Sequence, residues 1–291
     1  MSTHSIAFIG TGVMGRSMAG HLQKAGHQLH VHNRTKAKAQ DLLDAGATWH
    51  DTPGSAAAQA DFVFTIVGFP SDVEETYFGA QGVLAHAKPG TVVVDMTTSS
   101  PALARRIAEA AAAKDLLALD APVTGGDVGA REARLVIMVG GTETAFARTR
   151  PLFEVMGKNI ALHGGPGSGQ LCKLANQIGI ASVMVSWCEA LNFAQRAGLD
   201  PTRVLESISG GAAGSVGMTV LAPRALRGDF APGFYVKHFL KDLRLALEAA
   251  EAMKLDLPGT KQAKQLYEQV AARGWEDSGT QVLFRLYAER A

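Results

Sequence analysis

A short apolar run followed by three spaced glycines restricts the fold of this chain more than any other feature. The segment IAFIGTGVMGRSMAGHL places Gly10, Gly12 and Gly15 directly after a strand-like run and at the start of a helical pattern. In such a motif the first glycine makes a tight turn, the second lets the backbone approach a pyrophosphate, and the third packs helix against strand. The helix N-terminus then offers N–H groups to the phosphates. The predicted cofactor contacts in this loop are Gly10, Thr11, Gly12, Val13, Met14 and Gly15.

Up to about residue 163, short apolar runs alternate with helical segments. Strands are predicted over 6–10, 28–32, 61–68, 91–96, 116–123 and 135–141, with helices over 13–25, 36–45, 72–79, 101–114 and 143–156. Strands that are apolar almost throughout and alternate with helices indicate a parallel sheet covered on both faces. The sequence therefore predicts an α/β domain over residues 1–163.

After Gly164 the strand pattern disappears and long helical patterns take over. A helix is predicted from about 170 to 197, ended by Gly198, and Asp200-Pro201 then begins another as N-cap and first-turn proline. Further helices are expected over 202–208, 217–226, 238–253, 258–273 and 279–289. Residues 164–291 are therefore predicted to form an all-helical domain, joined to the first by the long helix.

The end of the second strand bears on which nicotinamide cofactor is used. An enzyme that uses NAD normally has Asp or Glu there to hold the ribose 2′-hydroxyl, but this chain has Asn33, followed by Arg34 and Thr35. A guanidinium can bind a 2′-phosphate with two hydrogen bonds, and a threonine can donate its hydroxyl. These three residues favour NADP over NAD. The alternative is that Arg34 and Lys36 only cap and solubilise the next helix.

The composition of the 291-residue chain excludes several other classes of protein. Hydrophobic residues make up 47%, charged residues 19%, and the formal net charge is +1, so neither nucleic acid nor a membrane surface is an expected partner. The apolar tract 178–194 contains Ser182, Ser186, Glu189 and Asn192, which favours a buried helix over a membrane span. The first residues show no secretory pattern, so we expect a cytoplasmic protein.

Cysteine and histidine usage gives no sign of a disulfide or a metal. Cys172 and Cys188 would lie about 24 Å apart on one helix, far beyond disulfide reach, and both are expected to be free thiols. The nine histidines form no metal-ligand spacing such as HExxH. No metal is predicted.

Two further loops leave the carboxyl ends of predicted strands, where ligands bind in open α/β sheets. They are DMTTSSP at 95–101 and DAPVTGGDVGA at 120–130. In the second, the backbone N–H groups of Gly125 and Gly126, with the Thr124 hydroxyl, could bind a substrate carboxylate. Taken alone, each loop could also be an ordinary strand-ending turn, which is the less favoured interpretation.

The predicted long helix begins GSGQLCKLANQ and carries an amine and two amides among apolar neighbours. Lys173, Asn176 and Gln177 stand at i, i+3 and i+4, which places them on one helical face. A lysine on an apolar helix can also extend its amine to solvent without any chemical role. The clustering of three polar groups makes a functional site the preferred interpretation.

Five motifs in this order resemble the β-hydroxyacid dehydrogenases, which include 3-hydroxyisobutyrate dehydrogenase and the tartronate, succinic semialdehyde and glyoxylate reductases. The motifs are GxGxMG at 10–15, DxTT…P at 95–101, DxPVTGG at 120–126, GxGQxxKxxNQ at 167–177 and FxKD at 239–242. Together they span nearly the whole chain. The resemblance implies an N-terminal Rossmann domain with a doubly wound sheet and a C-terminal all-α domain, with catalysis between them.

The resemblance also assigns roles to individual residues. It implies that Lys173 is the general acid/base, that Asn176 positions it, and that Thr124, Gly125 and Gly126 bind the substrate carboxylate. Thr98 and Lys241 match cofactor-contacting positions, and Asp242 supports Lys241. Contacts are also expected from Val67, Gly68 and Phe69 to the cofactor and from Gln177 and Phe234 to the substrate, with Ser215 and His238 as weaker candidates for the pocket.

The chain departs from the family pattern at several positions. Thr124 replaces a common serine, Ala133-Arg134-Leu135 replaces Gly-Thr-Leu, and Gln177 replaces an asparagine. We therefore expect an NADP(H)-dependent oxidoreductase of small 3-hydroxy acids or semialdehydes, without a prediction of the substrate. Two alternatives remain: 6-phosphogluconate dehydrogenase chemistry, which would have His-Asn at Ala175-Asn176, and an NADPH-binding redox sensor without turnover.

The long helix also bears on assembly. It is apolar almost all round, so it has more apolar surface than one small domain can cover. A homodimer or homotetramer packed through the helical halves is the expected assembly.

Overall fold

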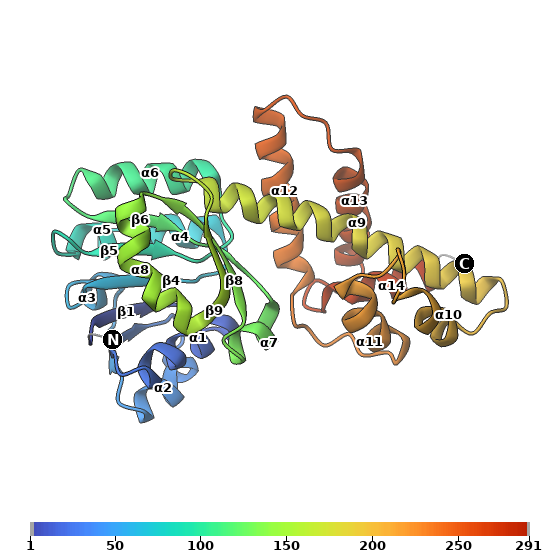
Figure 1. Ribbon diagram of the computed structural model, residues 1–291, viewed down its shortest axis with the longest axis horizontal. Coiled ribbons are helices and arrows are strands. Elements are labelled where there is room, and N and C mark those ends of the chain that lie inside the picture. Colours follow the sequence, from blue (N-terminus) through green and yellow to red (C-terminus); the bar gives the residue numbers. More distant parts are fainter. Residues whose placement is uncertain (1–2, 290–291) are drawn as a thin grey trace. The chain divides into compact units, whose positions relative to one another are not determined.

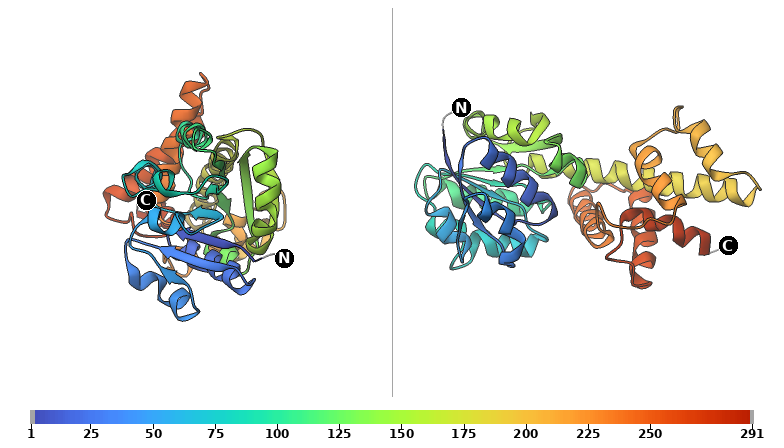
Figure 2. Two further views of the ribbon diagram at one scale, coloured as in Figure 1. Left: turned by 90° about the vertical axis from the view of Figure 1, so that its left-hand side faces the viewer. Right: turned by 90° about the horizontal axis from the view of Figure 1, so that it is seen from below.

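The computed structural model describes residues 3–289, which divide into two compact units, Met1–Lys173 and Leu174–Ala291. The first unit contains a nine-stranded sheet with helices on both faces, and the second is built of helices (Figures 1 and 2). The predicted fold class, a Rossmann-type α/β domain followed by an all-α domain, is confirmed.

The sheet is mixed, and its strand order is β3-β2-β1-β4-β5-β6-β8-β7, with β9 paired to β8. The strands are β1 (Ser5–Ile9), β2 (Gln28–His32), β3 (Thr48–Trp49), β4 (Phe62–Thr65), β5 (Val92–Asp95), β6 (Leu117–Asp120), β7 (Val123–Thr124), β8 (Leu135–Gly141) and β9 (Gly157–Leu162). The six strands from the β3 edge to β6 run parallel. Strand order reverses at β1, which places a ligand crevice at the carboxyl ends of β1 and β4.

Two differences from the prediction lie at the β8 side of the sheet. The single strand predicted over 116–123 is divided into β6 and β7, and β8 runs antiparallel to both. The connection from β7 to β8 contains only the short helix α7 (Gly126–Arg131), whereas a parallel return needs a crossover of about a dozen residues or more. The short connection therefore favours a reversal of direction.

Helices of the first unit cover the two faces of the sheet with separate apolar cores. One face carries α1 (Val13–Lys24), η1 (Lys36–Ala39), α2 (Gln40–Asp44) and α8 (Glu143–Met156), and the other carries α3 (Pro53–Ala57), α4 (Pro70–Phe78), α5 (Val83–His86) and α6 (Pro101–Ala112). Because side chains alternate along a strand, Ile6 and Phe8 enter the first core, while Ala7 and Ile9 enter the second. Burial of each large apolar side chain contributes about 1.5–3 kcal/mol.

The second unit consists of α9 beyond Lys173 and the helices that follow. The elements are α9 (Ser168–Arg196), α10 (Pro201–Ile208), the π turn η2 (Gly217–Leu221), α11 (Ala222–Leu226), α12 (Val236–Ala252), α13 (Pro258–Ala272), η3 (Thr280–Val282) and α14 (Leu283–Glu289). Trp187 of α9 is fully buried in a core with Phe239 of α12 and Tyr267 of α13. The predicted N-cap is confirmed, because the Asp200 carboxylate accepts the N–H of Thr202 at 2.9 Å.

Helix α9 is long and apolar enough to span a membrane by length and composition alone. Of its most apolar window, 39% is buried within the structure. The core helix of a water-soluble protein passes the same test, so this feature is weak evidence for a membrane protein.

Candidate active site

The fingerprint loop after β1 has the geometry that a dinucleotide requires. Gly10 has φ +96°, and a Cβ added there would lie 2.1 Å from the Ile66 carbonyl oxygen. A Cβ at Gly15 would lie 1.9 Å from the Gly10 carbonyl oxygen, whereas one at Gly12 would meet nothing within 4 Å. Gly10 and Gly15 are thus needed for packing, whereas Gly12 faces open space that a side chain would fill.

Two further observations fit this loop to a phosphate group. Helix α1 has no side-chain cap and no acidic residue in its first turn. No carboxylate of this turn therefore neutralises the N–H groups and the positive end of the helix dipole. The Thr11 hydroxyl is buried and has no hydrogen-bond partner among residues 3–289. The loop therefore fits the pyrophosphate of a nicotinamide dinucleotide, with Val13 and Met14 on the first turn of α1.

The segment after β2 is tied to the fingerprint loop through Asn33. Its side-chain oxygen accepts the N–H of Thr11 at 3.1 Å, and its amide nitrogen donates to the Thr35 carbonyl at 2.9 Å. Asn33 thus fixes the turn that carries Arg34 and Thr35. The Arg34 side chain is 82% exposed and bonds through Nη1 to Asp72 Oδ1 at 3.2 Å, and Asp72 belongs to α4.

A buried polar network joins the carboxyl ends of β4 and β5. Thr97 accepts the N–H of Val67 through its hydroxyl at 3.0 Å and donates its own N–H to Asp95 Oδ1 at 3.1 Å. The same carboxylate oxygen accepts the Thr65 hydroxyl at 3.0 Å. Burial, opposed by hydrogen bonds from Thr97 and Thr65, raises the pKa of Asp95 to about 6.

The start of α9 is bonded to the carboxyl ends of β5 and β6. Asp120 at the end of β6 accepts the N–H of Gly167 through Oδ1 at 2.7 Å and that of Gln170 through Oδ2 at 2.8 Å. Gln170 is fully buried and accepts the Ser99 N–H at 2.8 Å while donating to the Thr97 carbonyl at 2.7 Å. Burial raises the pKa of Asp120 to about 6 against the opposing effect of these backbone N–H groups.

The same junction brings backbone against backbone. A Cβ added at Gly140 of β8 would lie 2.6 Å from the Gly169 nitrogen, and one at Gly169 would lie 2.4 Å from the Asp120 carbonyl oxygen. These approaches exclude any side chain at either glycine. The first turn of α9 is therefore held rigidly, one turn before Lys173.

Lys173 is the last residue of the first unit, and it is only 6% exposed. In the same unit, Thr124 ends β7 and is half-buried, and Gly125 has φ +124° as the N-cap of α7. Gly126 follows with φ +64° and is exposed. The turn conformation of both glycines leaves their backbone accessible after a strand end.

In the second unit, three predicted residues are linked through Asp242, which sequence reasoning assigned only a supporting role. Asn176 donates to Gln177 Oε1 at 2.8 Å, and Gln177 Nε2 donates to Asp242 Oδ2 at 2.7 Å. Lys241 Nζ lies 3.0 Å from Asp242 Oδ1. Gln177 and Asp242 are each 1% exposed, so they orient Asn176 and Lys241 from a buried position.

The weaker candidates lie elsewhere in the second unit. The Phe234 ring packs edge-on against Phe239 at 5.8 Å, and the His238 ring packs against Tyr235 at 5.7 Å. The Ser215 hydroxyl accepts the N–H of Met218 at 3.1 Å.

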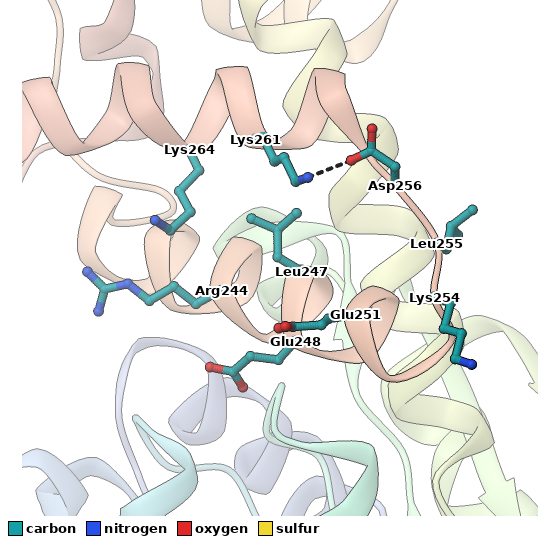
Figure 3. A pocket seen from close by; sticks show the side chains of 9 residues that line it. All are labelled: Arg244, Leu247, Glu248, Glu251, Lys254, Leu255, Asp256, Lys261 and Lys264. Carbon is teal, nitrogen blue, oxygen red and sulfur yellow. Dashed lines mark hydrogen bonds and ion pairs between the residues drawn. The ribbon is translucent and has the colours of Figure 1, made fainter.

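A groove of about 600 Å³ lies between α12 and α13, and none of the predicted site residues lines it (Figure 3). Its walls carry both charges, and Lys261 pairs with Asp256 at 2.5 Å. Lys264, also in the groove, pairs with Glu268 at 2.7 Å. This neutralised surface offers no convergent set of catalytic groups.

The cysteine side chains and the possible metal-ligating side chains of residues 3–289 are the last groups of the site region. Cys172 and Cys188 are free thiols, as predicted. Cys172 Sγ lies 3.4 Å from His163 Nε2, and burial raises the pKa of the Cys172 thiol, which disfavours a nucleophilic thiolate. Within residues 3–289, no group of three or more His, Cys, Asp or Glu side chains could hold a metal ion.

Sequence reasoning assigned no role to Asp72, Asp95, Asp120 or Gln170. Two of them begin motifs that the sequence did single out, DMTTSSP and DAPVTGG, and Gln170 lies within GSGQ. The available signal was a carboxylate at the last position of an otherwise apolar strand. Such a group is buried by its position and needs hydrogen-bond donors.

The glycine loop at a switch point of a doubly wound sheet, together with a buried lysine beyond the strand ends, defines a nucleotide-dependent oxidoreductase. Residues 5–165 match the model of the NAD binding domain of 6-phosphogluconate dehydrogenase. Residues 167–287 match the NAD-binding domain of NADP-dependent 3-hydroxyisobutyrate dehydrogenase. The chain belongs to the 3-hydroxyisobutyrate dehydrogenase family of NAD(P)-dependent 3-hydroxyacid dehydrogenases.

Individual relatives are similar over nearly their whole length. A probable 3-hydroxyisobutyrate dehydrogenase-like protein of Arabidopsis thaliana is 52% identical over 97% of this chain and 84% of its own. The 2-hydroxy-3-oxopropionate reductase of Escherichia coli is 44% identical over 92% of both chains. The solved structure of Mycobacterium tuberculosis 3-hydroxyisobutyrate dehydrogenase with L-serine is 31% identical, covers both chains completely and has a TM-score of 0.90.

Proposed function

We propose that this chain interconverts a small 3-hydroxy acid and its semialdehyde, with Lys173 as the general acid/base and NADP(H) as the preferred cofactor. The observation that carries this proposal is the burial of Lys173 on a helix whose first turn is bonded to the ends of β5 and β6. Lysine side chains are mostly exposed in proteins, so the burial of this one distinguishes it from the other lysines of the chain. This position lies beyond the strand ends, where ligands of doubly wound sheets bind.

The chemistry can be divided among the residues of the chain. A bound nicotinamide dinucleotide supplies or accepts the hydride. During reduction, Lys173 protonates the oxygen that becomes the alcohol, and in the reverse direction it accepts the hydroxyl proton. The hydroxyl of Thr124 and the N–H groups of Gly125 and Gly126 bind the substrate carboxylate. Asn176, held by Gln177, orients the amine or the substrate.

The same proposal includes substrate contacts from Gln177 and Phe234 and cofactor contacts from Val67, Gly68, Phe69, Thr98 and Lys241. NADP is favoured because position 33 carries an amide where an NAD-selective carboxylate would stand, and because Arg34 and Thr35 follow it. Named relatives act on 2-hydroxy-3-oxopropionate and 3-hydroxyisobutyrate, so semialdehydes of this size are the first substrates to test.

The first experiment is the oxidation of NADPH, followed by its absorbance, with glyoxylate and with the succinic, tartronate and methylmalonate semialdehydes. Lys173→Ala is expected to lower kcat by about 100- to 10,000-fold, because the variant has no general acid. The matched control is Lys158→Ala, which removes an exposed lysine of β9. Turnover by Lys173→Ala that equals the wild type would show that another group is the acid. NADPH binding without turnover of any aldehyde would favour the sensor alternative.

We also propose that the protein assembles as a homodimer or homotetramer through its helical unit. The support is a row of exposed side chains along α9, with Ser182, Ser186 and Glu189, which ends at Phe193 with 75% of its surface exposed. Light scattering coupled to size-exclusion chromatography measures the assembly directly.

A further inference from the structure

A carboxylate from α4, that of Asp72, lies beside the segment after β2 where the cofactor ribose would bind. The residue at the end of β2 is Asn33, and its amide is occupied with Thr11 and Thr35. Asp72 of α4 lies 38 residues beyond Arg34 along the chain, yet its Oδ1 lies 3.2 Å from Arg34 Nη1. An acidic group is therefore present where the local sequence predicted none.

Asp72 is held in this position by the start of its own helix. Its second oxygen, Oδ2, accepts the N–H of Phe69 at 3.0 Å, in the capping arrangement that begins α4. Its side chain is 21% exposed, against 82% for Arg34. The carboxylate is thus held by a second hydrogen bond from its own helix, whereas most of the arginine side chain faces solvent.

Arg34 is the residue that a 2′-phosphate would use, so the ion pair has consequences for cofactor choice. A phosphate must either take the guanidinium from Asp72 or bind it beside a fixed negative charge. Both carry an electrostatic cost that a neutral 2′-hydroxyl does not meet. Two nearby basic side chains are engaged elsewhere: Lys36 lies over the Trp49 ring at 5.4 Å, and Arg16 pairs with Asp41 at 3.1 Å.

We propose that Asp72 is a specificity-determining residue that restrains the preference for NADP(H) and lets the site retain affinity for NAD(H). The inference rests on the proposed cofactor-binding role of Arg34. It assigns cofactor selectivity to a pair of residues from two elements, Arg34 after β2 and Asp72 on α4, rather than to the β2 end alone.

The test is the binding of NADPH and of NADH to the whole protein without substrate, each titrated by the fluorescence of the nucleotide. The measured quantity is the ratio of the Kd for NADH to the Kd for NADPH. Asp72→Asn keeps an oxygen that can cap the Phe69 N–H but removes the charge. We expect this ratio to rise about three- to tenfold, almost entirely through tighter NADPH binding. A factor of this size corresponds to the loss of one exposed ion pair and one screened charge–charge contact.

Two further variants complete the design. Glu74→Gln removes a carboxylate from the same helix, but its ion pair is with Arg106 at 2.9 Å, so the ratio should stay within about twofold of the wild type. Arg34→Ala should lower the ratio, and adding Asp72→Asn to Arg34→Ala should change it less than adding Asp72→Asn to the wild type. Melting temperatures verify that each variant is folded.

The outcomes separate the inference from the proposed function. A ratio that is unchanged or lower in Asp72→Asn, with wild-type NADPH binding intact, overturns the role of Asp72 and leaves the oxidoreductase proposal standing. A ratio that Arg34→Ala leaves unchanged overturns both the role of Arg34 and the inference. A wild-type protein that binds neither nucleotide overturns the proposed function itself.

Discussion

Replacement of Asp95 by asparagine should stabilise the protein increasingly as the pH rises. Burial raises the pKa of this carboxyl from 3.8 to about 6. Because the folded-state pKa is the higher one, the stability that protonated Asp95 contributes is present below pH 3.8 and is lost as the pH rises through 6. At about 1.4 kcal/mol for each pH unit, the ionised group costs about 3 kcal/mol at neutral pH.

The asparagine variant removes this cost without losing the hydrogen bonds around the site. The Thr65 hydroxyl and the Thr97 N–H both donate to the same oxygen, Oδ1, so the amide oxygen of asparagine can replace it. The new N–H₂ group costs about 1–3 kcal/mol if it finds no acceptor, but this cost does not vary with pH. The prediction therefore concerns the pH dependence: the difference in free energy of unfolding, variant minus wild type, should rise by about 2.4 kcal/mol between pH 4 and pH 7.

Urea denaturation followed by circular dichroism at several pH values gives this difference. Hydrogen exchange of β4 and β5 peptides would show that the change lies in the first unit. The control is Asp61→Asn, an exposed carboxylate that accepts the Ser5 N–H at 3.0 Å. A difference that stays flat, or that falls with pH, would refute the reasoning, because it would mean that the hydrogen bonds outweigh the burial of the charge.

Other substitutions test the loop and the anchor of α9. Gly15→Ala should destabilise the first unit by several kcal/mol, since its Cβ would lie 1.9 Å from the Gly10 carbonyl oxygen, and thermal melting measures this. Gly12→Ala should fold normally, because its Cβ meets nothing, but should weaken NADPH binding at least about tenfold in a titration, where the methyl occupies the pyrophosphate approach. Gln170→Met should lower kcat about 10- to 100-fold with little change in the Kd for NADPH, because misplacement of Lys173 affects the reaction more than cofactor binding. Equal losses in both quantities would instead indicate a general loss of structure.

Much of the fold could be predicted because its signals are local. The glycine loop, the apolar runs of the parallel strands and the proline-marked helix starts at Pro101 and Pro201 depend on neighbours within a few residues. The helix predicted over 101–114 is observed as Pro101–Ala112, and the strand over 28–32 is observed unchanged.

The remaining strands lacked such a signal. Strand β3 has two residues, Thr48 and Trp49, which is too short for any periodicity. Strand β9 reads GKNIAL, with only its second half apolar, and is held through pairing with β8. These strands form because a partner strand is already present, and a single segment does not reveal that.

The candidate site also combines residues that local motifs reveal with residues that only the fold brings together. Lys173 and the glycines could be singled out from spacing, but Asp120 and Gln170 lie 50 residues apart along the chain and meet only in the folded sheet. The ion pair of Arg34 with Asp72 spans 38 residues. The roles of such residues depend on long-range partners, which motifs alone do not specify.

The glycine contacts at the start of α9 have a consequence for anyone who wishes to change what this enzyme accepts. Gly140 and Gly169 tolerate no side chain, so randomised libraries that include them would consist largely of misfolded members. Diversity is better placed outside this junction, for example at Thr124, which is half-buried at the end of β7. With the helix start left intact, each library member would keep the anchored turn that carries Lys173, and differences in activity could be assigned to the varied position.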